Sequence, residues 1–410
     1  MSDAADQITA ERIERARSVI ADVTRRTPVV ESATLSDRLG APVMLKAENL
    51  QRVGSFKVRG ALNKLAALGD GCAAGVVCAS AGNHAQAVAL AARERGVACE
   101  VVMPVGAAVA KFEATQALGA RVTLEGESVT ECVELARARA EAAGKSFIHP
   151  FDDPEVICGQ GTLGLELLEQ ISDLSTVIVP IGGGGLIGGV AAIIKAVSPG
   201  TRVIGVQAGA MAAVPASLTA GRPEPAAVAR TIADGIAVRA PSALTLALID
   251  RWVDDVVTVD EDEIAAAMVL LLEKAKLVVE GGGAVGVAAL LSGRIEARDG
   301  GTICPVLSGG NVDPGLLAAL ARRHESEAGR RHVLFTRVPD RPGGLVTLLN
   351  LVADAGANIV DVTHLREGIG LHVAETGVQL VIETRSREHA GAVVGAMRSG
   401  GYDVMRPVPA

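Results

Sequence analysis

Aromatic residues are scarce in this sequence, which has 5 Phe, 1 Tyr and 1 Trp among 410 residues. Proteins that hold single-stranded nucleic acid stack its bases on aromatic rings. Such a surface has almost nothing here to be made from. Since apolar residues still make up 49% of the chain, the sequence predicts hydrophobic cores built from Ala, Val, Leu and Ile.

Positive charge is also in short supply, because 39 basic residues face 47 acidic ones and leave a net charge of -8. A protein of this charge has no general attraction for phosphate polymers or anionic membranes. No apolar run reaches the roughly 18 residues that a membrane helix needs, and the N-terminus lacks the pattern of a signal peptide. We therefore expect a soluble protein with no nucleic-acid partner and no membrane partner.

The CxxC spacing is absent as well, and the six cysteines are scattered, mostly within apolar runs. Cysteines placed in this way are typical of small core residues in a reducing compartment. The seven His include no HExxH pattern, so the sequence predicts no metal site. The expected location is the cytoplasm.

Glycine, in contrast, is abundant, with 47 residues. The length exceeds the roughly 250 to 300 residues at which a single core stops growing, so two domains, or one large domain with an appendix, are expected. From residue 73 onward, short β-branched runs alternate with Ala-rich helical patterns, and several of these helices end in Gly. This alternation predicts parallel sheets covered by helices on both faces. Strands are expected at 76–79, 99–103, 122–124, 176–179, 203–207 and 302–307, and helices at 84–95, 111–118, 128–143, 186–196, 261–276 and 315–322.

A charged segment, RRHESEAGRR at residues 322–331, interrupts this alternation and predicts a domain boundary. The remaining residues have the order strand, helix, strand, strand, helix, strand, which is the ferredoxin-like βαββαβ motif. These elements are expected at 332–338, 343–355, 358–365, 377–384 and 387–397, with a final strand near Tyr402.

Three glycine-containing clusters each follow a predicted strand, at residues 80–84 (SAGNH), 182–185 (GGGG) and 308–311 (SGGN). Ligands of parallel sheets gather at the carboxyl ends of strands, so the three clusters could line one crevice. The second cluster opens a helix, where free N–H groups and the helix dipole attract an anion. We interpret it as a phosphate site, with another anion, a nucleotide or tight helix packing as alternatives. A dinucleotide is disfavoured because the GxGxxG pattern and its acidic partner are missing.

Lys57 lies in the motif GSFKVRG, beside Phe56 and before a helical segment. A lysine in an apolar setting can lose its proton and become a nucleophile toward a carbonyl. The alternative is an ordinary surface lysine. Taken with the phosphate site, the lysine suggests pyridoxal phosphate as the cofactor.

Six motifs occur in order along the chain: GSFKVRGA, SAGNHAQ, HPFDDPEVICGQGT, VPIGGGGL, EGGGAVG and LSGGN. Together they resemble the fold type II pyridoxal-phosphate enzymes, and most closely the threonine dehydratases, or threonine ammonia-lyases. The segment DRPGGLVTLLNLVADAGANIVDV resembles an ACT domain, an amino-acid-sensing module. The resemblance implies two parallel-sheet α/β subdomains of the tryptophan synthase beta-like architecture, followed by a ferredoxin-like βαββαβ ACT domain. We place the catalytic domain at 1–325, with a smaller subdomain at about 45–150 inserted in the larger one, a linker at 326–332 and the ACT domain at 333–410.

The resemblance also implies roles for individual residues. Lys57 forms the Schiff base with pyridoxal phosphate and later acts as the base at the substrate Cα. Asn83 hydrogen-bonds the 3-hydroxyl group, and Ser308 faces the pyridine nitrogen. The full set of cofactor residues is Phe56, Lys57, Asn83, Gly182, Gly183, Gly184, Gly185, Leu186 and Ser308, and the set for the substrate carboxylate is Ser80, Gly82, Asn83 and His84.

The implied reaction is the α,β-elimination of water from L-threonine, which gives 2-oxobutanoate and ammonia, with L-serine giving pyruvate in the same way. Serine racemases carry a second serine where this chain has Ala81, so dehydration is favoured over racemisation. Serine racemase and hydroxyaspartate dehydratase remain alternatives of the same fold. A non-catalytic amino-acid-binding regulator is an alternative of another class, which the presence of Lys57 disfavours.

The ACT-like segment predicts a second ligand site. Its turn at Asp340, Gly343 and Gly344, with Asn358 in the next strand, is expected to bind an amino-acid effector such as isoleucine or valine. A dimerisation module that has lost its ligand is the alternative. The resemblance favours a homodimer or homotetramer. Glu280 is interpreted either as a residue near the cofactor or as a solvated loop residue, and glycines outside the ligand loops as helix stops and turns.

Overall fold

The computed structural model describes residues 5–297, 300–366 and 372–405. The chain divides into two compact units, residues 1–312 and 313–410, and each is described by itself. Within the described residues, no helix combines the length and the apolar character that crossing a membrane requires.

The smaller sheet of the first unit has four parallel strands in the order β5-β4-β3-β6. Alternate residues of β3 face opposite sides: Val76 and Cys78 pack toward α4 and α5, while Val77 and Ala79 pack toward α7. This arrangement is expected when both faces of a parallel sheet are covered. The elements are α4 (Lys57–Leu68), β3 (Val76–Ala79), α5 (Asn83–Arg95), β4 (Cys99–Met103), α6 (Val109–Ala117), β5 (Arg121–Leu124), α7 (Val129–Ala142) and β6 (Ser146–Phe147).

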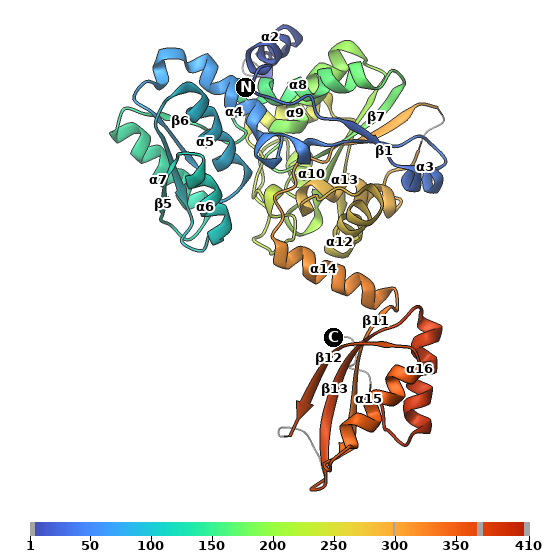
Figure 1. Cartoon of the computed structure of the whole chain (residues 1–410). Helices are drawn as coiled ribbons and strands as arrows, with labels where there is room; N and C mark the ends of the chain where they lie inside the picture. The colour runs from blue at the N-terminus through green and yellow to red at the C-terminus, as the bar shows by residue number, and fades with distance from the viewer. Residues whose placement is uncertain (1–4, 298–299, 367–371, 406–410) are drawn as a thin grey trace. The chain divides into compact units, whose positions relative to one another are not determined.

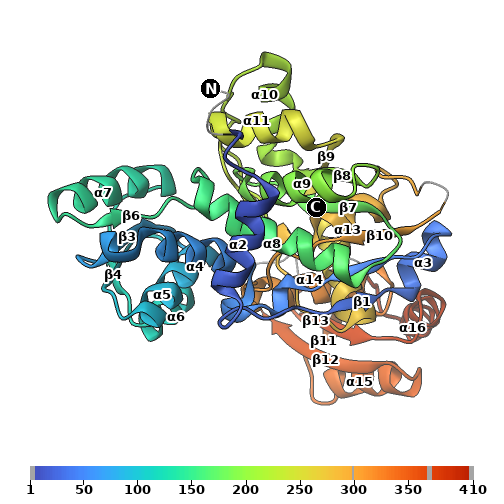
Figure 2. The same ribbon diagram turned by 90° about the horizontal axis from the view of Figure 1, so that it is seen from above.

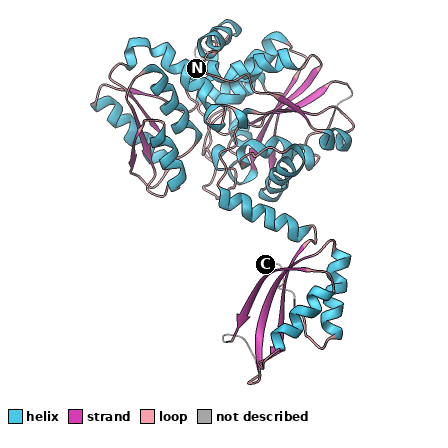
Figure 3. Cartoon of the chain, viewed as in Figure 1, coloured by secondary structure: helices cyan, strands magenta, loops and turns pink. Residues whose placement is uncertain are grey.

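The larger sheet is also parallel, with strand order β10-β7-β8-β9. Val177 and Val179 of β7 pack in one core with residues of α8 and α9, whereas Ile178 between them lies against Gly286 of α13. Figure 3 shows helices on both sides of this sheet. The elements are α8 (Pro154–Gln170), β7 (Leu174–Pro180), α9 (Gly185–Val197), β8 (Arg202–Ala208), β9 (Asp255–Val259), α12 (Glu261–Leu270), α13 (Gly281–Leu291) and β10 (Thr302–Pro305).

The remaining elements of this unit surround the two sheets (Figure 1). A short antiparallel pair, β1 with β2, precedes the smaller sheet, and Lys46 of β2 bridges to Val306 just after β10. The helices and strands concerned are α2 (Ala10–Ile20), β1 (Val29–Glu31), α3 (Ala33–Leu39), β2 (Met44–Lys46), α10 (Val214–Ala220) and α11 (Ala243–Trp252), with short helices at Glu48–Leu50, Arg52–Gly54, Gly69–Cys72, Gly209–Met211, Asp234–Ile236 (η5) and Leu271–Ala275.

Glycines inside helices allow α4, α8 and α9 to pack very closely, and Figure 2 shows α8 beside α9. A Cβ at Gly159 of α8 would lie 2.6 Å from the carbonyl oxygen of Arg59 and 2.7 Å from the Cα of Gly60. On α9, a Cβ at Gly189 would meet Gly161 of α8, with 2.8 Å to its backbone nitrogen. The expectation that glycines outside the ligand loops are helix stops and turns is therefore wrong for Gly159 and Gly161, because it considered only local conformation.

Four buried charges hold the same region together. The Arg59 guanidinium donates to both oxygens of Glu48 at 2.8 Å and to Glu166 of α8 at 2.7 Å. Lys46 donates to the other oxygen of Glu166 at 2.5 Å. Burial alone would raise the pKa of Glu48, but the charges of Arg59 and Lys46 and the hydrogen bonds from Arg59 and Thr27 together outweigh burial and keep this pKa below its ordinary value.

The second unit begins with α14 (Pro314–Glu327) and contains an antiparallel sheet with strand order β11-β13-β12. Its elements are β11 (Arg331–Pro339), α15 (Gly344–Asp354), β12 (Asn358–Leu365), β13 (Glu375–Glu383) and α16 (Arg387–Ser399). The expected last strand is represented in the described residues by Met405, which exchanges two backbone hydrogen bonds of 2.8 Å with Phe335. This bridge puts Met405 beside β11, as the ferredoxin-like motif requires of its last strand.

The predicted fold class is confirmed in both units, and most predicted elements agree with the observed ones within two residues. The segment at 322–331 differs, because α14 continues through Glu327 and β11 begins at Arg331. The predicted linker at 326–332 therefore contains a helix end and a strand start. The predicted domain limits themselves stay a prediction.

We predict that Gly159→Ala destabilises the first unit, because its new methyl group has no room against the backbone of α4. Overpacking of this kind lowers the free energy of unfolding by about 1 to 3 kcal/mol. Urea denaturation followed by circular dichroism measures the change. Gly71→Ala is the control, since no atom lies within 4 Å of a Cβ there. Equal denaturation midpoints for the two variants would contradict the prediction.

Candidate active site

The carboxyl ends of three parallel strands position the predicted site. β3 leads through Ser80 to α5, β7 leads to the glycine loop before α9, and β10 leads to Ser308. Backbone contacts tie the Lys57 segment to the last of these loops, since Phe56 donates its N–H to the Ser308 carbonyl at 3.1 Å and Ser55 bridges to Gly309.

Lys57 is the first residue of α4 and its side chain is half-buried. Its amine donates to the Pro150 carbonyl at 3.0 Å and lies 5.2 Å from the centroid of the Phe56 ring. Burial lowers the pKa of Lys57 to about 8, an effect that the Glu280 charge partly opposes. Such an amine is deprotonated far more often at neutral pH than an ordinary lysine, as a nucleophile must be.

The glycine loop has the chemistry of an anion site. Gly184 adopts φ +92° as the N-cap of α9, and Gly183, Gly185 and Leu186 are buried. Within the described part of the chain, no hydrogen bond is recorded from the backbone N–H groups of these residues or of Gly182. Side chains at 183 and 185 would collide with Phe151, which packs over the loop. Buried N–H groups at a helix start fit a phosphate, so the residues present fit pyridoxal phosphate.

Asn83 begins α5 and is hydrogen-bonded at both ends of its amide group. Its Nδ2 donates to Glu280 at 2.7 Å, and its Oδ1 accepts from Asn311 at 2.7 Å. Glu280 is 5% exposed, so its interpretation as a solvated loop residue is wrong. Nothing in the local pattern of residues indicates this burial, because the contact joins positions 197 residues apart.

Glu280 also has an unusual protonation equilibrium. Burial and the nearby Asp234 charge raise its pKa to about 7, while the hydrogen bond from Asn83 and the charges of Lys111 and Lys57 act in the opposite direction. Lys111 of α6 pairs with Asp234 of η5 at 2.5 Å. The site thus contains an acid and an amine that can each hold or release a proton near neutral pH.

The residues predicted for the substrate carboxylate divide into two groups. Gly82 and Asn83 lie at the start of α5, where backbone N–H groups are available to an anion. Ser80 uses its hydroxyl to accept from the N–H of Gly82 at 3.1 Å. The His84 ring is buried and bonds the Ile148 carbonyl at 3.0 Å, and burial and the charge of Lys57 lower its pKa to about 3. Only the backbone N–H of His84 is therefore suited to a carboxylate.

Ser308 is 2% exposed and follows β10, close to Phe56. Sequence reasoning assigned no role to Asn311, although the SGGN motif contains it. Among the described residues, no group of three or more His, Cys, Asp or Glu side chains is arranged to hold a metal ion.

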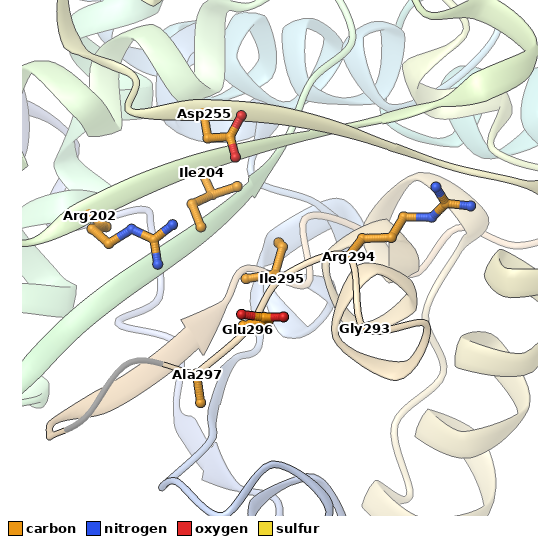
Figure 4. Close-up of a pocket in the computed structure, with 8 residues that line it drawn as sticks. All are labelled: Arg202, Ile204, Asp255, Gly293, Arg294, Ile295, Glu296 and Ala297. Atoms are coloured by element: carbon orange, nitrogen blue, oxygen red, sulfur yellow. The ribbon is translucent and has the colours of Figure 1, made fainter.

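Two pockets are lined by residues other than those predicted for the cofactor and the substrate. One, of about 350 Å³ in the second unit, is lined by Asp340 and Gly343 together with His364 and Arg366. Gly344 begins α15 and Asn358 bonds Glu383 at 3.1 Å, and neither lines this pocket. The other, of about 280 Å³, includes Arg202, Asp255 and Arg294 (Figure 4). Arg202 and Asp255 are the first residues of β8 and β9, so this pocket lies at the amino ends of these strands, whereas the predicted site lies at carboxyl ends.

Comparison with known proteins identifies the family. The family described as pyridoxal-phosphate dependent enzyme matches residues 20–309. The chain belongs to this family. A second family, the ACT domain, matches residues 332–399.

Similar proteins agree with this assignment. The chain is 44% identical over 398 residues to the L-threonine ammonia-lyase of Thermotoga maritima, a match that covers 97% of this chain and 99% of that protein. Among solved structures, the threonine deaminase of T.th. is 42% identical, with a TM-score of 0.70 over 74% of this chain and 99% of its own. Maize serine racemase is 36% identical, with a TM-score of 0.73 over 78% and 98%. The resemblance inferred from the six motifs is confirmed.

We predict that the lowered pKa of Lys57, about 8 against an ordinary 10.5, makes its amine unusually reactive in the cofactor-free protein. Acetylation followed by mass spectrometry as a function of pH measures this for each lysine. Modification of Lys57 is expected to reach half of its maximum rate near pH 8, and exposed Lys274 is the lysine used for comparison. Identical pH profiles for the two lysines would show that burial does not activate Lys57.

Proposed function

We propose that this pyridoxal-phosphate-dependent enzyme is a threonine ammonia-lyase, which converts L-threonine to 2-oxobutanoate and ammonia. The observation that carries the proposal is the half-buried Lys57 amine, with its pKa lowered to about 8, at the start of a helix in a family of pyridoxal-phosphate enzymes. The name of the Thermotoga maritima relative supports this reaction.

The candidate residues divide the work between binding and proton transfer. Bound pyridoxal phosphate draws electrons from the substrate Cα and so makes its proton acidic. Lys57 holds the cofactor and takes that proton. The N–H groups of Gly182–Leu186 hold the phosphate, and those at the start of α5 hold the substrate carboxylate. Loss of the β-hydroxyl as water leaves 2-aminocrotonate, and one water is taken up when this product hydrolyses to 2-oxobutanoate and ammonia.

Ser308 favours elimination over competing reactions. If the neutral Ser308 hydroxyl faced the pyridine nitrogen of bound pyridoxal phosphate, as the family resemblance implies, it would not hold a proton there as a carboxylate would. Negative charge at the substrate Cα would then be less delocalised, and Ser308 would favour expulsion of the β-hydroxyl over transamination.

A serine racemase is the second candidate, because maize serine racemase has a similar fold at 36% identity. Racemisation needs an acid on the side of Cα opposite to Lys57. Residue 81, where racemases carry a serine, is Ala in this chain. Elimination needs no such group, which favours the lyase.

We predict that Lys57→Ala lowers the rate of 2-oxobutanoate formation from L-threonine by at least about 100-fold, because the variant lacks the general base. Coupled reduction of 2-oxobutanoate measures the rate. Lys274→Ala, which removes an exposed amine, is the control and is expected to keep full activity.

L-Serine should also give pyruvate. Its kcat/KM is expected to differ from that of L-threonine by a factor of about 10 to 200, because the two substrates differ by one methyl group. D-Serine as the main product from L-serine would favour the racemase instead.

The second unit is proposed to make the activity respond to an amino acid such as isoleucine or valine. Asp340 and Arg366 lie 3.1 Å apart at its pocket. A carboxylate and a guanidinium there complement the ammonium and carboxylate groups of a free amino acid. We further propose a cytoplasmic homodimer or homotetramer, in keeping with the scattered buried cysteines and the family resemblance.

We predict that Asp340→Asn raises the concentration of isoleucine or valine needed for half of its effect on threonine turnover by at least about fivefold. The variant loses the carboxylate that faces the effector ammonium group. Asp361→Asn, on exposed β12, is the control. An unchanged response in Asp340→Asn would remove this residue from the effector site, and no response in the unmodified protein would remove the effector itself.

A further inference from the structure

Asn83 takes part in a chain of hydrogen bonds that connects four separate segments. Asn311 donates from the same Nδ2 atom to the Val53 carbonyl at 2.8 Å and to Asn83 Oδ1 at 2.7 Å. Asn83 then donates from Nδ2 to Glu280 Oε1 at 2.7 Å. The segments are the loop before Lys57, the start of α5, the loop after β10 and the start of α13.

The direction of this chain is set at both ends. A backbone carbonyl only accepts hydrogen bonds, so Val53 requires that Asn311 present its NH₂ group. Both hydrogens of that group are then used, and the second one requires an oxygen on Asn83. At the other end, the ionised carboxylate of Glu280 also only accepts, so it requires the NH₂ group of Asn83. Both ends favour the same orientation of the Asn83 amide, so the loss of either one weakens the preference for it.

The surroundings hold both ends in place. Val53 has φ +53°, a conformation that is costly for a β-branched residue. The hydrogen bond from Asn311 and that from Gly310 N–H to the Gly54 carbonyl, at 2.9 Å, tie this strained turn to the loop after β10. Glu280 lies against Gly235 and Gly309, where a side chain at either position would meet its carboxylate.

We propose that Asn311 and Glu280 are positioning residues that fix the orientation of the Asn83 amide, so that its second Nδ2 hydrogen is the one donor it offers to the cofactor. A reversed amide would set its oxygen against the Glu280 carboxylate and its NH₂ group against that of Asn311. It would also offer no donor toward the cofactor. Neither positioning residue needs to touch the cofactor. The inference rests on the proposed cofactor role of Asn83.

The test is the apparent Kd of pyridoxal phosphate, measured from the visible absorbance of the bound cofactor at about pH 8, above the Glu280 pKa of about 7. Glu280→Gln replaces a carboxylate, which only accepts hydrogen bonds, by an amide. This amide can accept from the NH₂ group of Asn83 or donate to its oxygen, so it allows either orientation of Asn83. Asn311→Ala removes the donor at the other end. Each is expected to weaken binding about tenfold, the effect of one hydrogen bond. Asn49→Ala is the matched control, because Asn49 bonds the nearby Val278 carbonyl at 3.0 Å but has no recorded bond to Asn83.

The same substitutions in an Asn83→Ala background separate positioning from other effects. If the two residues act through Asn83, Glu280→Gln and Asn311→Ala change the Kd less than about twofold there. A full tenfold effect in that background overturns the proposal, because it shows action through Lys57 or through the loop itself. Glu280→Gln keeps the shape of the side chain. The Kd of this variant therefore still tests the proposal if Asn311→Ala does not fold. A native protein that binds no pyridoxal phosphate would instead refute the proposed function.

Discussion

The position of Lys57 depends on how α4 is held against α8. Arg59, two residues after Lys57, is buried with its guanidinium between Glu48 and Glu166, and Lys46 neutralises the remaining oxygen of Glu166. Charges withdrawn from water are tolerated only when each has a partner, and removing one partner costs about 3 to 5 kcal/mol. Since Glu48 keeps a lowered pKa, its contribution to stability is present above its unfolded-state pKa and is lost as the pH falls through the folded-state value.

Close helix packing extends this constraint to the phosphate loop. Gly60 and Gly159 let α4 approach α8, and Gly161 and Gly189 let α8 approach α9. The first residue of α4 is Lys57 and the N-cap of α9 is Gly184. The proposed nucleophile and the proposed anion site therefore belong to the ends of helices whose separation is fixed by glycine contacts. A site assembled in this way needs little reorganisation when it binds its ligand.

Local sequence patterns predicted the helices, strands and glycine loops because period, caps and turns are local properties. They also predicted Lys57 as the reactive amine, since its neighbours Gly54 and Phe56 are adjacent in the chain. Other features depend on residues about 100 or more positions apart. They are the hydrogen bonds that Asn83 makes with buried Glu280 and with Asn311, and the contact between Gly60 and Gly159. Nothing in their local sequence distinguishes them, so only the folded chain shows that Glu280 accepts a hydrogen bond from Asn83.

Burial displaces the protonation equilibria of Lys57 and Glu280 in opposite directions. Burial favours the neutral form of each, and so lowers the pKa of Lys57 to about 8 and raises that of Glu280 to about 7. Their mutual attraction opposes both shifts, so neither group becomes permanently neutral. A base must accept a proton and give it up again within one turnover, which requires a pKa near the working pH. The same apolar packing that orders the three loops thus sets Lys57 in the range where it can act as nucleophile and as base.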